Sequence, residues 1–160
     1  MTVIVWVTEG TWPACVDAAR TYAPPGKDVV LLHVTGDDAA AAAHGAFRGL
    51  MGRGHPERDP GTRLEAMAAE AAVGLLDAAA ERLGRPADRV ERRGRIEREV
   101  VQVADGADLL IVARDGDRTR LGPHSLGPPT RFVVDHAPCP VLLVWPETPP
   151  EIGSIPPPPH

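Results

Sequence analysis

The residues of this chain best suited to chemistry are four arginines that lie close together in one segment. Arg114, Arg118, Arg120 and Arg131 each carry a guanidinium group, which forms charge-assisted hydrogen bonds with phosphates and carboxylates. This spacing is compatible with an anion-binding site. Charge runs on loops, however, usually lie in solvent. The sequence leaves both interpretations open and favours the exposed loop.

Prolines occupy the place in this segment where an anion would need backbone donors. A helix is predicted to begin near Gly127 and is followed at once by Pro128 and Pro129. Helix N-termini bind anions through unpaired backbone N–H groups aided by the helix dipole. Proline has no N–H, although it is sterically acceptable at this end of a helix. We therefore expect the helix to form with a depleted anion site.

Other chemistry is weakly supported. The segment His124–Gly127 is similar to a nucleophile elbow, but Pro123 stands where that motif needs glycine. The segment Asp115–Asp117 lacks the remaining oxygen ligands of a calcium loop and is typical of a turn. His44 and His55 have no partners at metal-ligand spacing. The sequence thus predicts no catalytic residues and no metal site.

Alternating strands and helices must position this segment. Short apolar runs rich in β-branched residues, bounded by turn residues, predict most of the strands. The predicted strands are residues 2–7, 28–34, 88–93, 108–113 and 140–145. Helices are predicted between them, which indicates an α/β fold with a parallel sheet covered on both faces. Charge on residues 88–93 suits an edge strand.

The region between the second strand and the next helix is the hardest to interpret. Residues 35–61 combine an alanine run with several glycines and a polar stretch, which predicts a mobile excursion with one short helix. The sequence leaves open whether this excursion is a lid or binding loop or a disordered segment. The segment Thr62–Glu65 fits a capping box, so the long helix is expected to begin there. Helical spacing places Leu64 and Met67 on the face expected to join the core.

Composition limits the class of protein. The chain has 160 residues and a net charge of −5, which argues against a nucleic-acid partner. Two cysteines, Cys15 and Cys139, suggest buried apolar residues because they lack disulfide or zinc spacing. The sequence has no apolar run long enough for a membrane span, so we expect a cytoplasmic protein. Residues 1–146 are expected to form one domain, followed by a proline-rich tail at 147–160.

Several segments together resemble the universal stress proteins over residues 1 to about 146. The most specific is His136–Val141, which is similar to the family's link between its last helix and last strand. The segments Leu31–Val34, Arg93–Ile96 and Ala107–Val112 also stand at the places that the family leads us to expect. The resemblance implies a Rossmann-like fold of the adenine nucleotide alpha-hydrolase-like type. Its single open five-stranded sheet would have the order 3-2-1-4-5.

The family's phosphate motif is degenerate in this chain. Nucleotide-binding members resemble one another in a G-x2-G-x9-G-[S/T] motif. Here Gly127 matches the third glycine, whereas Arg114 and Asp117 replace the first two and Pro128 replaces the hydroxyl residue. The resemblance therefore implies family-equivalent positions that have lost much of their phosphate-binding chemistry.

The adenine side of the implied site is also altered. Family members that bind ATP commonly have an aspartate at the end of the first strand, where this chain has Thr8. Val34 matches the other base-contacting position. Strand order would reverse between the first and fourth strands, and ligands of open α/β sheets bind at such a point. We expect no cofactor; the alternative is ATP or AMP.

The resemblance and the apolar last strand together predict a homodimer. Residues Val141 to Trp145 would form an edge strand with little charge, and universal stress proteins typically dimerise through this strand. The alternative is that the proline-rich tail folds back and shields the edge. Polyproline segments also bind aromatic-lined grooves, so the tail is a candidate site for a protein partner.

The sequence therefore supports a binding or regulatory protein of the stress response, dimeric and not binding ATP in the usual way. The alternative is a sensor that holds ATP, AMP or another anionic metabolite between the first and fourth strands, with weak hydrolysis at most. High alanine content, and arginine far outnumbering the single lysine Lys27, hint at a bacterial source.

Overall fold

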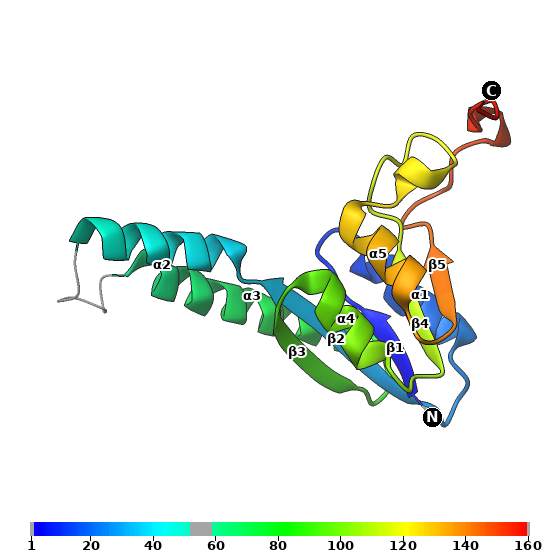
Figure 1. Ribbon diagram of the computed structural model, residues 1–160. Coiled ribbons are helices and arrows are strands. Elements are labelled where there is room, and N and C mark those ends of the chain that lie inside the picture. Colours follow the sequence, from blue (N-terminus) through cyan, green and yellow to red (C-terminus); the bar gives the residue numbers. More distant parts are fainter. Residues whose placement is uncertain (1, 52–58, 160) are drawn as a thin grey trace.

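The computed structural model describes residues 2–51 and 59–159, which form an open α/β fold (Figure 1). Five parallel strands lie in the order β3-β2-β1-β4-β5, which confirms the predicted fold class and order. The strands are β1 (Thr2–Trp6), β2 (Asp28–Gly36), β3 (Asp88–Gly94), β4 (Leu109–Ala113) and β5 (Val141–Val144). The helices are α1 (Trp12–Tyr22), α2 (Asp38–Met51), α3 (Pro60–Leu83), α4 (Ile96–Ala104) and α5 (Pro128–His136). Two 3-10 turns follow β4 and β5, η2 (Pro123–Ser125) and η3 (Ile152–Ser154).

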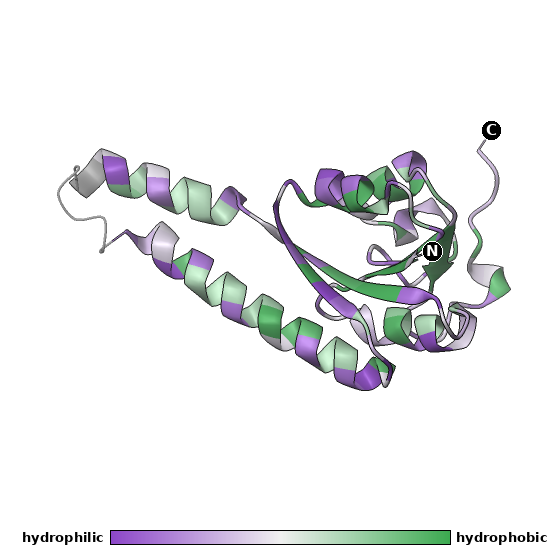
Figure 2. Ribbon diagram, turned by 90° about the horizontal axis from the view of Figure 1, so that it is seen from below, coloured by the Kyte–Doolittle hydropathy of each residue, from purple (hydrophilic) through white to green (hydrophobic). Residues whose placement is uncertain are grey.

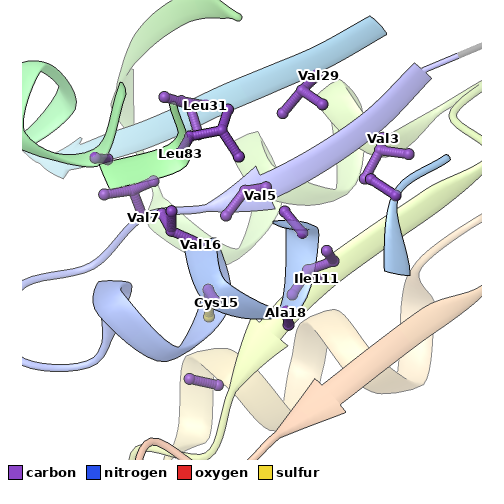
Figure 3. Packing of buried hydrophobic residues seen from close by; sticks show 14 of the residues in the cluster. Val3, Val5, Val7, Cys15, Val16, Ala18, Val29, Leu31, Leu83 and Ile111 are labelled. Atoms are coloured by element: carbon purple, nitrogen blue, oxygen red, sulfur yellow. The ribbon is translucent and has the colours of Figure 1, made fainter. Parts of the chain in front are cut away.

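Helices cover both faces of the sheet, and each face has its own core. Successive residues of a strand point to opposite faces. Val3 and Val5 of β1 therefore join a cluster with α1 and α3, while Ile4 and Trp6 join a cluster with α4 and α5. Figure 3 shows the first cluster, in which Val16 of α1 packs near the strands. Burial on both faces explains why β1 is continuously apolar.

The two cysteines differ in exposure. Cys15 is fully buried in the first cluster, as predicted, and burial raises the pKa of its thiol to about 12. Cys139 is only half-buried at the margin of the second cluster, where burial also raises the pKa of the thiol. Neither thiol is in its reactive thiolate form near neutral pH.

The region 35–61 differs from its prediction. Helix α2 fills Asp38–Met51 and packs beside the N-terminal part of α3, and these two segments project away from the sheet (Figures 1 and 2). Five consecutive alanines begin this helix, and alanine's helix propensity outweighs the cost of the glycines that follow. His55 and the rest of 52–58 lie outside the described residues. We call residues 38–51 and 60–71 the arm.

Helix α3 begins earlier than the predicted capping box. Asp59 is its N-cap, with Oδ1 accepting from the Gly61 amide at 2.8 Å, and Pro60 is the first helical residue. An aspartate followed by proline is a strong helix start. Glu65 does not reach back to Thr62; its carboxylate instead contacts His44 and Arg93. The predicted capping box is wrong.

The buried face of α3 is also rotated from the predicted stripe. The helix buries Gly61, Ala72, Leu76, Ala79 and Leu83. Leu64 remains 40% exposed and Met67 60% exposed. Helix α2 fixes this rotation, because a Cβ added to Gly61 would lie 2.6 Å from the His44 ring. The prediction that Met67 belongs to the core is wrong.

A charged cluster attaches the arm to the sheet edge. His44 of α2 contacts Asp59 through Nδ1 and Glu65 through Nε2, the latter at 2.8 Å. Arg93 of β3 lies 2.9 Å from the same Glu65 oxygen. Hydrogen bonds with Asp59 and then Glu65 raise the pKa of His44. At Asp59, burial favours a raised pKa, but the hydrogen bonds with His44 and the Gly61 amide act against burial and the pKa is lowered. Hydrogen bonds with His44 and then with Arg93 lower the pKa of Glu65.

This cluster should hold the arm most firmly in mildly acidic solution. The His44 contribution is complete below its unfolded pKa of about 6.5 and is lost as pH rises through the raised folded value. The carboxylates contribute fully above about pH 4.3 and lose their contribution as pH falls through their lowered values. We expect the His44 ring resonance to titrate at higher pH in the protein than in a peptide of residues 38–51. Glu65→Gln should lower the NMR midpoint; an equal midpoint in protein and peptide would contradict the cluster.

Candidate functional site

The candidate site lies where the strand order reverses, at the carboxyl ends of β1 and β4. These neighbouring strands pair in parallel, Val3 with Leu109 and Val5 with Ile111. Open α/β sheets bind ligands in the crevice at such a point. The segment 7–11 leaves β1 there, and the long loop 114–127 leaves β4.

Thr8 and Val34, the two predicted base-contacting residues, are both engaged in the fold. The Thr8 carbonyl accepts from the Trp12 amide at 3.0 Å, and its hydroxyl lies 2.6 Å from the Thr11 hydroxyl. Thr8 therefore supports the start of α1. Val34 is 4% exposed and belongs to the second core cluster. The Val34 side chain is therefore not exposed to a base.

The loop after β4 is closed by pairing of its two ends. The Gly116 amide donates to the Ser125 carbonyl and the Asp117 amide to the His124 carbonyl, both at 2.8 Å. A Cβ added to Gly116 would lie 2.3 Å from the His124 carbonyl oxygen, so this approach requires glycine. Ser125 is 1% exposed and its hydroxyl donates to the Gly122 carbonyl at 2.7 Å. That hydroxyl closes the loop and is not displayed as a nucleophile.

Asp115 fills the N-terminus of α5. Its Oδ1 accepts from the Gly127 amide and its Oδ2 from the Thr130 hydroxyl, both at 2.8 Å. The first four N–H groups of a helix have no partner within it. In α5 Gly127 gives its N–H to Asp115, and Pro128 and Pro129 have none. Only the Thr130 amide remains of the donors that a phosphate would use.

Three of the four arginines also have partners within the fold. The Arg114 guanidinium carbon lies 4.6 Å from the Trp145 ring centroid, and Nη1 donates to the Ser125 hydroxyl. Arg118 donates to Glu147 at 2.8 Å, and Arg131 donates to the Pro123 carbonyl. Arg120 lines a cavity of about 220 Å³, which is walled by the loop and by Pro156 of the tail. These contacts favour a structural role for most of the arginine segment.

Asp117 forms a turn, as its sequence predicts. Its Oδ1 accepts from the Thr119 amide at 2.9 Å and from the Thr119 hydroxyl at 2.5 Å. These hydrogen bonds lower the pKa of Asp117. Over residues 2–51 and 59–159, no group of three His, Cys, Asp or Glu side chains is arranged to hold a metal ion.

The structure thus places four of the six predicted site residues in one segment and two in other segments. Arg114, Asp117, Gly127 and Pro128 all lie in the closed loop or at the helix that follows it, whereas Thr8 and Val34 belong to β1's exit and to β2. Sequence reasoning missed Asp115, whose carboxylate accepts the hydrogen bonds at the N-terminus of α5. No local pattern reveals it, because the contact joins the two ends of a long loop.

Some buried side-chain polar atoms lack hydrogen-bond partners. In the described part of the chain, these atoms are Trp6 Nε1, Thr35 Oγ1 and Arg114 Nε. They lie at the carboxyl ends of β1 and β2 and directly after β4. Trp6 and Thr35 point to opposite faces of the sheet, because Trp6 shares the second cluster with Val34 and Thr35 is the next residue. Buried polar groups are normally paired, so Arg114 Nε, directly after β4, could be satisfied by a small ligand with acceptor atoms.

Comparison with known proteins identifies the family. The model of the universal stress protein family matches residues 3–144, whereas no curated protein sequence is significantly similar. In the part of the chain that the structure covers, no helix is both long and apolar enough to cross a membrane.

Solved structures agree on the fold. The hypothetical protein MJ0577 has a TM-score of 0.68 at 19% identity, over 92% of this chain and 96% of its own. A universal stress protein in complex with cAMP has a TM-score of 0.60 at 17% identity, over 92% of this chain and 98% of its own. The universal stress protein UspA from Lactobacillus plantarum has a TM-score of 0.57 at 21% identity, over 90% of this chain and 97% of its own. With its family match over nearly the whole domain, this chain belongs to the universal stress protein family.

Proposed function

We propose that this protein is a regulatory or binding member of its family in the stress response, and that it does not hold ATP in the usual way. The observation that carries this proposal is the Asp115 carboxylate bound to the Gly127 amide and the Thr130 hydroxyl. A carboxylate at a helix N-terminus supplies the negative charge that a phosphate would otherwise bring. The protein then acts through contacts with other proteins.

The last strand supports a homodimer as part of this function. The Pro140 carbonyl accepts from the Leu110 amide, and the Val144 carbonyl accepts from the Arg114 amide. Backbone groups of successive strand residues point in opposite directions, so the N–H and C=O of Leu143 face the open edge of the sheet. Side chains of Val141–Val144 are all half-buried. The tail bonds to the loop, through Ser154 to the Leu121 amide and Glu147 to Arg118. A second copy pairing along Val141 to Trp145 would cover the edge.

A ligand sensor is the second candidate. The unpartnered Nε of Arg114 favours it, since a bound molecule with an acceptor atom would satisfy this donor. One similar structure is a universal stress protein in complex with cAMP. AMP or ATP would have to displace Asp115 from α5 before a phosphate could reach the Thr130 amide. Anionic ligands should accordingly bind weakly to this protein.

Calorimetry with nucleotides tests the proposal. We expect the purified protein to give no binding heat with ATP, ADP or AMP in the micromolar range, with or without magnesium. The physical reason is that one backbone donor remains at α5 and a carboxylate repels the phosphate. Micromolar binding of ATP would overturn the proposal in favour of the sensor.

Truncation after Trp145 provides the control for the dimer. If the last strand mediates self-association, removal of the tail leaves the association state of the full chain unchanged. A truncated protein that becomes larger, while the full chain is a monomer, would show that the tail shields the edge.

A further inference from the structure

The outer side of the arm carries an apolar stripe that the fold does not cover. Leu64 is 40% exposed and Met67 60% exposed. At 3.6 residues per turn, Leu64, Met67 and Ala71 lie within about 60° of one another on α3. Helix α2 packs on a different side, where His44 contacts Glu65 and approaches Gly61. Figure 2 shows that this part of α3 extends away from the sheet.

The charges beside this stripe are self-complementary. Arg63 and Glu70 flank the stripe on one side of α3. Arg63 precedes Met67 by four residues, and Glu70 follows Met67 by three. Neither forms an ion pair with another residue that the structure describes. If a second α3 lies antiparallel across Met67, Arg63 faces Glu70 of the partner subunit, and symmetry repeats the pair.

We propose that the arm is a self-association surface, on which α3 of a second copy packs antiparallel with Met67 near the two-fold axis. Two helical hairpins would then form a four-helix arrangement that buries Leu64 and Met67. The self-complementary charges identify the occupant as another copy of this chain. Like charges would meet if the two helices were parallel and in register.

This surface is separate from the last strand. The arm leaves the fold beside β3, whereas β5 forms the opposite edge of the sheet (Figure 1). A protein with both two-fold contacts assembles beyond a dimer, and a protein with the arm contact alone stops at a dimer. The arm proposal therefore stands whether or not the last strand pairs.

Sedimentation velocity over a range of concentrations tests the stripe. Met67→Glu places a charge on the two-fold axis and should raise the dissociation constant of the arm contact at least about tenfold. Val73→Glu is the matched control, because Val73 is 54% exposed on the same helix but about 120° away from Met67. Equal association of wild type and both variants, with unchanged circular dichroism, would overturn the proposal.

A charge exchange tests the orientation. Arg63→Glu and Glu70→Arg should each weaken association, because each places like charges opposite one another. The double variant restores opposite charges and should recover most of the wild-type affinity. The last strand cannot produce this pattern, since neither residue lies near β5. Failure of the double variant to recover would contradict the antiparallel pairing.

Discussion

Replacing Asp115 with alanine should loosen α5 and expose its N-terminus. The variant loses acceptors for the Gly127 amide and for the buried Thr130 hydroxyl, so the free energy of unfolding should fall by about 1–2 kcal/mol. Asp115 itself is exposed, which keeps the loss moderate. Thermal and urea unfolding measure the change. Asp117→Ala is the matched control: Asp117 is two residues away, and among the described residues its side chain accepts hydrogen bonds from Thr119 alone, so the change should stay within about 0.5 kcal/mol.

The same substitution separates two reasons for weak phosphate binding. Asp115→Ala removes the competing carboxylate but leaves Pro128 and Pro129 without N–H groups. Adding Pro128→Ser and Pro129→Ala restores both donors. We expect calorimetry to detect inorganic phosphate or ATP with the triple variant and not with Asp115→Ala alone. Phosphate binding by the single variant would show that the carboxylate alone blocks the site, and no binding by the triple variant would contradict the whole account.

The sheet could be predicted because its signals are local. The apolar strands are largely continuous apolar runs bounded by turn residues, as Val3–Val7 shows, and the charges of Asp88–Arg93 mark an edge. Such short apolar runs are typical of strands that are buried on both faces of a parallel sheet. The helix start at Gly127 was likewise visible, because prolines at the first turn fix the boundary.

The contacts that shape the candidate site could not be predicted because they join distant residues. Asp115 reaches Gly127 only after the loop between them has closed, and Gly116 makes that closure possible. The face of α3 depends on α2, whose packing against Gly61 turns Met67 outward. Residue periodicity gives the existence of an amphipathic helix but does not say which neighbour covers which part of it.

Gly116→Ala should have the largest effect of any single substitution in the loop. The added Cβ would lie 2.3 Å from the His124 carbonyl oxygen and 2.9 Å from the Ser125 carbonyl carbon. Both neighbours are backbone atoms, so the loop can relieve the clash only by separating its ends. Separation breaks the Gly116–Ser125 and Asp117–His124 hydrogen bonds. We expect the free energy of unfolding to fall by about 3 kcal/mol, measured by urea unfolding.

Gly74→Ala supplies the control for this substitution. A Cβ at Gly74 meets nothing within 4 Å in the exposed middle of α3, so alanine should stabilise the protein by about 0.5–1 kcal/mol. The two glycine substitutions therefore differ in sign. In Gly116→Ala the separated loop should also weaken the contact of Arg114 with Trp145, which changes the tryptophan fluorescence of the folded state. A Gly116→Ala protein as stable as wild type, with unchanged fluorescence, would show that the loop is not closed by this backbone contact.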